Sequence, residues 1–116
     1  MTKMYIAVRE DVPDYMVPTL VAHTVLNSYI SRRDGSYLGS YTDLYDHWLE
    51  YSFKKCVVKV SPKQFERVKE IPHVYLGHES TTLNGEKSCG IVVVEDNHLY
   101  KVLQFAKLWS PNGQTN

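Results

Sequence analysis

The sequence predicts an α/β fold in which helices cover both faces of a small mixed sheet, giving a three-layer α/β/α arrangement. Short apolar segments with high β propensity alternate with segments of helical periodicity, a pattern typical of strands joined by helices. The segment Gly90–Glu95 has the highest β propensity, so we expect a central strand there. We expect four strands, most of them parallel. The connection between the last two is barely the roughly dozen residues that a parallel crossover requires, so these two are expected to be antiparallel.

The first half of the chain contains two expected strands and two expected helices. Residues Lys3–Glu10 indicate a strand that leads into a helix over Val17–Arg33. A loop rich in glycine and serine, Asp34–Ser40, breaks the chain before a second helix over Tyr41–Tyr51, which has one apolar face. The short apolar segment Lys55–Val60 then predicts the second strand.

A helix-start signal follows the second strand. Ser61 can cap a helix with its hydroxyl, and Pro62 suits the first helical turn. The helix is expected to run to about Glu70, and its periodicity places Phe65 and Val68 toward the core.

The remainder of the chain predicts two strands, a final helix and a tail. Residues His73–Gly77 indicate the third strand and Gly90–Glu95 the fourth. Apolar periodicity predicts a last helix over Asn97–Trp109. The segment Ser110–Asn116 is polar, contains proline and glycine, and is expected to be a frayed tail. Residues 1–109 are therefore expected to form one domain.

Composition narrows the class of protein. With 116 residues and 43% hydrophobic residues, the chain suits one globular domain rather than a disordered one. No apolar run approaches the ~20 residues of a membrane helix and no signal peptide is visible, so we expect no membrane partner and a cytoplasmic location. Cys56 and Cys89 are expected to be buried free thiols, with a cysteine nucleophile as the alternative. No metal-ligand spacing or phosphate-binding glycine signature is present, so no metal or cofactor is expected.

The charge pattern bears on nucleic-acid binding. The formal net charge is zero, whereas a protein drawn to nucleic acid by charge usually has a basic excess. A local basic patch is still compatible with this composition, and its candidate nucleic-acid-binding residues are Arg32, Arg33, Lys54 and Lys55. The alternative is ordinary solvated charge interleaved with acids. The tyrosines around the glycine-serine loop and the second helix suit a protein interface, base stacking or packing on the sheet.

Several short segments together point to a known family. They are KMYIAVRED at the start, AHT in the first expected helix, YDHWLEY followed by KKCVVKV, and FAKLW near the end. Their order and spacing, from Lys3 to Trp109, resemble those of the type II peptidyl-tRNA hydrolases, the archaeal and eukaryotic kind. The resemblance implies the fold of that family, hydrolysis of the ester between a peptide and tRNA, and tRNA as a partner. Family members are often dimers, so it also implies a homodimer.

The loop that carries the family's chemistry matches poorly. The family has a Gly-Lys-Gly-Lys-like loop before the first helix, and its lysine is thought to be catalytic. Here residues 13–18 are PDYMVP, and no lysine lies between Lys3 and Lys54. His23 does match the histidine of the family helix.

A second family motif, Asp-Ala-Gly-x-Thr, follows the third strand. An ungapped comparison places Glu79 on its aspartate, which keeps the carboxylate, and Leu83 on its threonine. Thr81 and Thr82 are adjacent but out of register. The resemblance therefore implies Glu79, His23, Thr81 and Thr82 as the candidate catalytic residues.

Two hypotheses of function follow. Ester hydrolysis needs a positioned water, a base and donors for the oxyanion, and the loss of one donor costs about 10²–10³ in rate. Arg9 is a poor substitute for the lysine, because an arginine rarely moves a proton. The first hypothesis is a degenerate active site in a protein that binds tRNA or a protein partner. The second is an active peptidyl-tRNA or aminoacyl-ester hydrolase that uses Glu79 with His23 or the nearby threonines. The alternative for that pair is a helix histidine bonded to backbone and a solvated loop acid.

Overall fold

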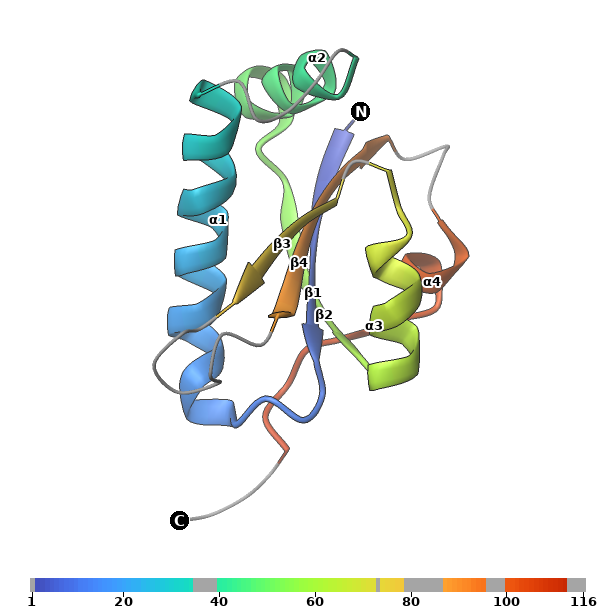
Figure 1. The fold of residues 1–116 in the computed structure, drawn as a ribbon. Helices are drawn as coiled ribbons and strands as arrows, with labels where there is room; N and C mark the ends of the chain where they lie inside the picture. Colours follow the sequence, from blue (N-terminus) through green and yellow to red (C-terminus); the bar gives the residue numbers. More distant parts are fainter. Residues whose placement is uncertain (1, 35–39, 73, 79–86, 96–99, 113–116) are drawn as a thin grey trace.

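The sheet lies between two layers of helices. The computed structural model describes residues 2–34, 40–72, 74–78, 87–95 and 100–112. Within these ranges five strands form one sheet in the order β3-β4-β1-β2-β5 (Figure 1). The strands are β1 Thr2–Arg9, β2 Lys55–Val60, β3 Val74–His78, β4 Lys87–Glu95 and β5 Lys107–Leu108. The α/β class and the layered arrangement agree with the sequence prediction.

Strand direction departs from the prediction of a mostly parallel, four-stranded sheet. Only β1 and β2 pair in parallel, while β4 is antiparallel to both β1 and β3, and β5 is antiparallel to β2. The physical reason is the position of β4, which is inserted between β1 and β3 and runs against both. The antiparallel pairing of the third and fourth expected strands is confirmed.

The first helix, α1, covers Val17–Arg33 as predicted, after the short 3-10 turn η1, Asp14–Met16. Its buried residues recur every three or four positions, which defines the face that packs on β1, β4 and β3. These buried residues are Val17, Leu20, Thr24 and Ser28.

The second helix, α2, covers Ser40–His47 and continues directly into a wider π-helical turn, η2, over Trp48–Ser52. The turn closes with a hydrogen bond from the Phe53 N–H to the Trp48 carbonyl, at 2.6 Å. Phe53 adopts a left-handed backbone, with φ of 60°. A bulky residue rarely adopts this conformation, so the turn holds Phe53 against its backbone preference.

The layer on the other side of the sheet contains α3, Pro62–Lys69, and the single-turn helix α4, Lys101–Gln104. A capping box starts α3: the Gln64 N–H donates to the Ser61 hydroxyl at 3.1 Å, and the Ser61 N–H donates to the Gln64 side chain at 2.7 Å. Phe65 and Val68 are fully buried, as predicted.

Two apolar clusters fill the space on the two faces of the sheet. Alternation along β1 directs Met4, Ile6 and Val8 toward α1 and η2. Ala7 belongs to the cluster under α3 and α4, which includes Val60 and the buried residues of α3. The middle strand of the sheet, β1, is therefore buried on both faces.

The end of the chain differs from the predicted helix over Asn97–Trp109. Residues 97–99 lie outside the described residues, α4 has only four residues, and the chain then extends into β5. The Trp109 N–H donates to the Val57 carbonyl at 2.9 Å, and Trp109 packs on the cluster beneath α1. The chain after α4 thus pairs with β2 as the strand β5 and does not continue as a helix.

The predicted frayed tail is attached over its first residues. The Asn112 N–H donates to the Asp14 carboxylate at 2.7 Å, and the Lys59 ammonium donates to the Asn112 side chain at 2.9 Å. These bonds fix residues 110–112 across the end of β2, whereas residues 113–116 lie outside the described part of the chain.

Candidate functional site

The connection between β1 and α1 covers residues 10–16, where the resemblance would place a lysine loop. Two of its apolar side chains, Val12 and Met16, are buried and retain only 2% and 8% of their accessible surface, and Val17 at the start of α1 is also buried, with 3%. These side chains anchor the connection in the hydrophobic core, while Asp11, Pro13 and Tyr15 are exposed.

Arg9, the cation at the end of β1, already has an acidic partner. Its Nε donates to the Asp11 carboxylate at 2.6 Å, and the arginine side chain is only 14% exposed. This bond uses one of the five N–H donors of the guanidinium, and the Asp11 carboxylate offsets the positive charge that would stabilise a developing oxyanion.

His23 lies on an exposed part of α1, and its Nε2 is 2.9 Å from the amide nitrogen of Asn27, one helical turn later. The predicted partners Glu79, Thr81 and Thr82 lie outside the described residues. The pairing of His23 with Glu79 therefore stays a prediction.

One contact connects α1 with the strand that precedes Glu79 in the chain. A Cβ added at Gly77 would lie 2.2 Å from Oγ1 of Thr24, so the helix approaches β3 as closely as glycine allows. The Thr24 hydroxyl is buried and donates to the Leu20 carbonyl at 2.7 Å. The residue next to His23 thus packs against a residue two positions before Glu79.

The predicted nucleic-acid-binding residues lie at the opposite end of the sheet, where α1 ends and β2 begins (Figure 1). Arg32 makes a bidentate ion pair with Asp46 of α2, at 2.8 and 2.5 Å. This hydrogen bonding raises the pKa of Arg32 above its usual value. Arg33 pairs with Asp34 at 3.1 Å and is exposed. Both arginines are therefore bonded to neighbouring carboxylates.

Lys55 lies among aromatic rings. Its ammonium is 3.3 Å from the centroid of the Phe53 ring and 5.3 Å from that of Trp48, and it donates to the Phe53 carbonyl at 2.8 Å. Partial desolvation lowers the pKa of Lys55. Lys54 is exposed, and its carbonyl accepts a hydrogen bond from the Trp48 indole at 2.7 Å.

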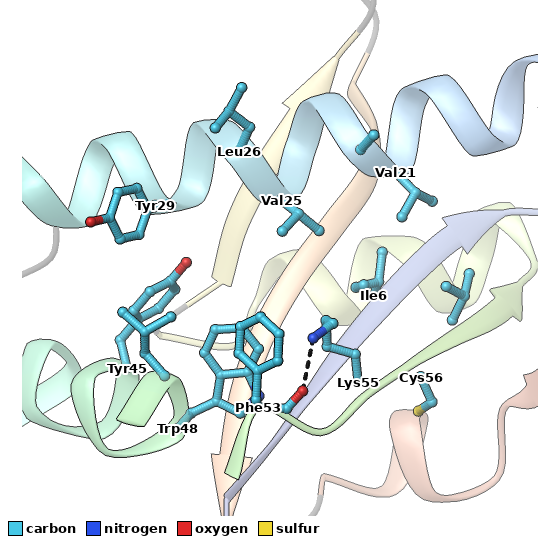
Figure 2. Close-up of a pocket in the computed structure, with 13 residues that line it drawn as sticks. Ile6, Val21, Val25, Leu26, Tyr29, Tyr45, Trp48, Phe53, Lys55 and Cys56 are labelled. Atoms are coloured by element: carbon cyan, nitrogen blue, oxygen red, sulfur yellow. Dashed lines mark hydrogen bonds between the residues drawn. The ribbon is translucent and has the colours of Figure 1, made fainter. Parts of the chain in front are cut away.

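An apolar groove of about 630 Å³ lies between α1 and the η2–β2 segment. Figure 2 shows Val21 and Val25 of α1 facing Ile6 of β1, with Trp48 and Phe53 across the groove. Val57, the β1-paired neighbour of Ile6, completes the floor. Lys55 is the one charged residue among those that line it in the described part of the chain. The full lining is Ile6, Val21, Ala22, Val25, Leu26, Tyr29, Tyr45, Trp48, Leu49, Phe53, Lys55, Cys56 and Val57.

The rim of the groove is apolar and exposed. Leu26 retains 60% of its accessible surface, Phe53 58% and Tyr29 43%. At the α2 end the Tyr45 ring is buried, its hydroxyl is 2.9 Å from that of Ser28, and burial raises its pKa. The groove is thus a hydrophobic surface with one cation.

Sequence reasoning missed this groove, although a signal was present. With successive residues about 100° apart around a helix, the apolar positions of 17–29 span an arc of roughly 240°. That arc is far wider than one sheet-facing stripe requires. Its outer part, including Val25 and Leu26, is the part that lines the groove.

The rest of the described chain offers few other reactive groups. No three of the described His, Cys, Asp and Glu side chains are grouped to hold a metal ion. Cys56 is a half-buried free thiol whose pKa is raised by burial, and its sulfur points away from the groove in Figure 2. Among the described helices, none combines the length and apolar character needed to cross a membrane.

Comparison of the chain with protein-family models and with curated proteins found no match to either.

Proposed function

We propose that this chain is a type II peptidyl-tRNA hydrolase-like protein with a degenerate active site, and that it acts through binding. The observation that carries the proposal is the connection between β1 and α1. It contains no lysine, and Val12, Met16 and Val17 are buried where the family has a polar loop. A chain that uses this connection as core has no cation there to polarise an ester.

The nearest alternative cation does not restore the chemistry. Arg9 is committed to Asp11, and an arginine is a poor proton donor or acceptor near neutral pH. The absence of one oxyanion donor lowers the rate by about 10²–10³. A binding role is compatible with that loss, whereas efficient turnover is not.

A protein partner suits the surface better than tRNA does. Nucleic-acid binding draws its affinity from cations that neutralise phosphates. Here Arg32 and Arg33 are paired with Asp46 and Asp34, and the net charge of the chain is zero. The apolar groove with its exposed rim is instead the kind of surface that proteins bury against one another.

A second candidate function is favoured by the contact between Gly77 and Thr24. This contact joins the turn of α1 that carries His23 to the strand that precedes Glu79 in the sequence. An active ester hydrolase would use this pair, with Thr81 or Thr82 as donors, to activate water.

A peptidyl-tRNA hydrolysis assay on the purified protein, beside a lysine-containing member of the family, tests the proposal. We expect hydrolysis at least ~10²-fold slower than that of the lysine-containing enzyme. A comparable rate would contradict the binding role and favour the hydrolase.

A further inference from the structure

We propose that the groove between α1 and β2 binds an amphipathic α-helix of a partner protein, whose apolar face carries one carboxylate that meets Lys55. The inference deepens the proposed function, since it rests on a binding role and names the partner's chemistry. Five observations support it: the space beside α1, the exposed rim, the nature of the floor, the single cation and the strained Phe53.

The first observation is the space. In the layer that contains α1, the helix packs on β1, β4 and β3. Over β2 the same face of the sheet is left as the groove, between α1 and the η2–β2 segment (Figure 2). Neighbouring helices in a layer lie about 8–10 Å apart. The groove is therefore the position that a second helix beside α1 would occupy.

The second observation is the exposed rim, which indicates that the occupant of the groove is a macromolecule rather than a small ligand. A small apolar molecule would contact the floor but would leave Leu26 and Phe53 on the rim exposed. A helix laid along the groove covers both floor and rim. Contiguous exposed apolar surface of this kind marks interaction sites between proteins.

The third observation is that the floor is the face of a sheet rather than an edge. Ile6 and Val57 are paired partners in the β1–β2 ladder, so the backbone beneath the groove is already hydrogen-bonded. An extended peptide buried there would leave N–H and C=O groups without hydrogen-bond partners, which is unfavourable. A helix satisfies its own backbone and can present an apolar face.

The fourth observation is the charge. Lys55 is the one charged residue lining the groove in the described part of the chain, and one of its three donors is used by the Phe53 carbonyl. A carboxylate can accept from the donors that remain, in a charge-assisted hydrogen bond. A cationic side chain at the same place would be repelled, so the sign of the partner's charge is fixed.

The fifth observation is the conformation of Phe53. Its left-handed backbone is disfavoured for a bulky side chain, and such conformations concentrate at binding sites. The conformation stacks the Phe53 ring on Trp48, with centroids 5.3 Å apart, and places it against the Lys55 ammonium. The turn and these contacts thus hold the Phe53 ring and the Lys55 ammonium together before a partner arrives.

The test measures binding of a synthetic helical peptide to the full chain by fluorescence anisotropy. The probe is a helix-forming peptide of about 18 residues, long enough to be helical in water, with leucines at i, i+3, i+4 and i+7 and one glutamate within that stripe. Two control peptides replace the glutamate with lysine or place a proline at the centre. We expect the glutamate peptide to bind most tightly and the proline peptide at least ~10-fold more weakly.

Matched variants locate the site. Leu26→Asp at the rim should weaken binding at least ~10-fold, because it places an unpaired charge under the helix. Leu108→Asp makes the same change at an exposed leucine on β5, 71% exposed against 60% for Leu26, and should have no effect. Lys55→Glu should reverse the preference between the glutamate and lysine peptides. Lys63→Glu, at an exposed lysine of α3, should leave that preference unchanged.

Several results would overturn the proposal. Equal binding of the helical and proline peptides, no binding at all, or equal losses in the Leu26 and Leu108 variants would each refute a helix in this groove. Self-association in sedimentation that Leu26→Asp abolishes would assign the groove to a second copy of the chain. Saturable binding of dodecanoate without peptide binding would assign it to a small amphiphile. None of these results changes the peptidyl-tRNA assay, so failure of this inference is distinguishable from failure of the proposed function.

Discussion

The two flanks of α1 differ in how closely the helix approaches the sheet. On the β3 side Thr24 touches Gly77 so closely that a Cβ on the glycine would lie 2.2 Å away. On the β2 side Val21 and Val25 stand over a groove of about 630 Å³. The helix thus lies close to β3 at a glycine, whereas the sheet over β2 is left as a groove. A close contact on one flank of a helix can therefore create a binding surface on the other.

The difference between the sheet-facing side of α1 and the groove rim should appear most strongly in the free energy of unfolding. Leu20 faces the sheet and is 1% exposed, so Leu20→Ala should cost about 2–5 kcal/mol in the free energy of unfolding. Leu26 stands on the groove rim, and Leu26→Ala should stay within about 0.5 kcal/mol. Urea denaturation of both variants beside the unchanged protein measures this. Similar losses at the two leucines would mean that the rim is covered in the free protein.

The close contact can be tested at its glycine. Gly77→Ala forces a methyl group into Thr24, and overpacking of this kind costs about 1–3 kcal/mol. Thermal melts of Gly77→Ala and of the double variant with Thr24→Gly provide the measurement, with recovery expected in the double variant. An unchanged melt in Gly77→Ala would show that the helix moves aside at no cost, and the comparison between the flanks would fail.

The basic end of α1 should contribute little to tRNA binding. Asp46 holds two donors of Arg32 and offsets its charge, so binding should be weak and should fall steeply with salt. Charge reversal at Arg32 and Arg33 should weaken whatever binding is seen. The matched control reverses Lys63 and Arg67 on α3. Tight binding that survives ~0.2 M salt in a filter-binding assay would contradict this expectation.

The smallest effects are expected on the flank that carries His23. If the chain acts by binding, Glu79→Gln and His23→Asn should leave the low rate of peptidyl-tRNA hydrolysis unchanged. His23 is exposed, so His23→Asn should also change the free energy of unfolding by no more than about 0.5 kcal/mol. Loss of hydrolysis in both variants with unchanged melts would instead identify the active hydrolase.

Local sequence signals predicted much of the fold. The bounds of α1 and β2 follow from sustained apolar periodicity and from turn residues at their ends, and the start of α3 follows from Ser61 and Pro62. The end of the chain was mispredicted, because Lys107 and Leu108 become a strand only by pairing with β2. That pairing is a tertiary contact, and helical periodicity in the segment does not reveal it.

The groove depends on tertiary placement in the same way. It lies between α1 and the η2–β2 segment, and α1 meets β3 on its other flank at Thr24 and Gly77. The position of Lys55 within it depends on the left-handed backbone of Phe53, and no residue preference predicts such a conformation for phenylalanine. The candidate catalytic residues came from family resemblance, and of these only His23 lies among the described residues.

The central position of β1 has a consequence for the order in which the protein assembles. Thr2 at its start pairs with Glu95, so β1 finds one of its neighbours in β4, a strand that is made later than β2. During synthesis on the ribosome β1 can pair with β2, but its other edge stays open until residues 87–95 have emerged. An open apolar edge on a nascent chain invites pairing with other chains. Recombinant expression at a slowed rate of translation therefore lengthens the period of greatest exposure to aggregation.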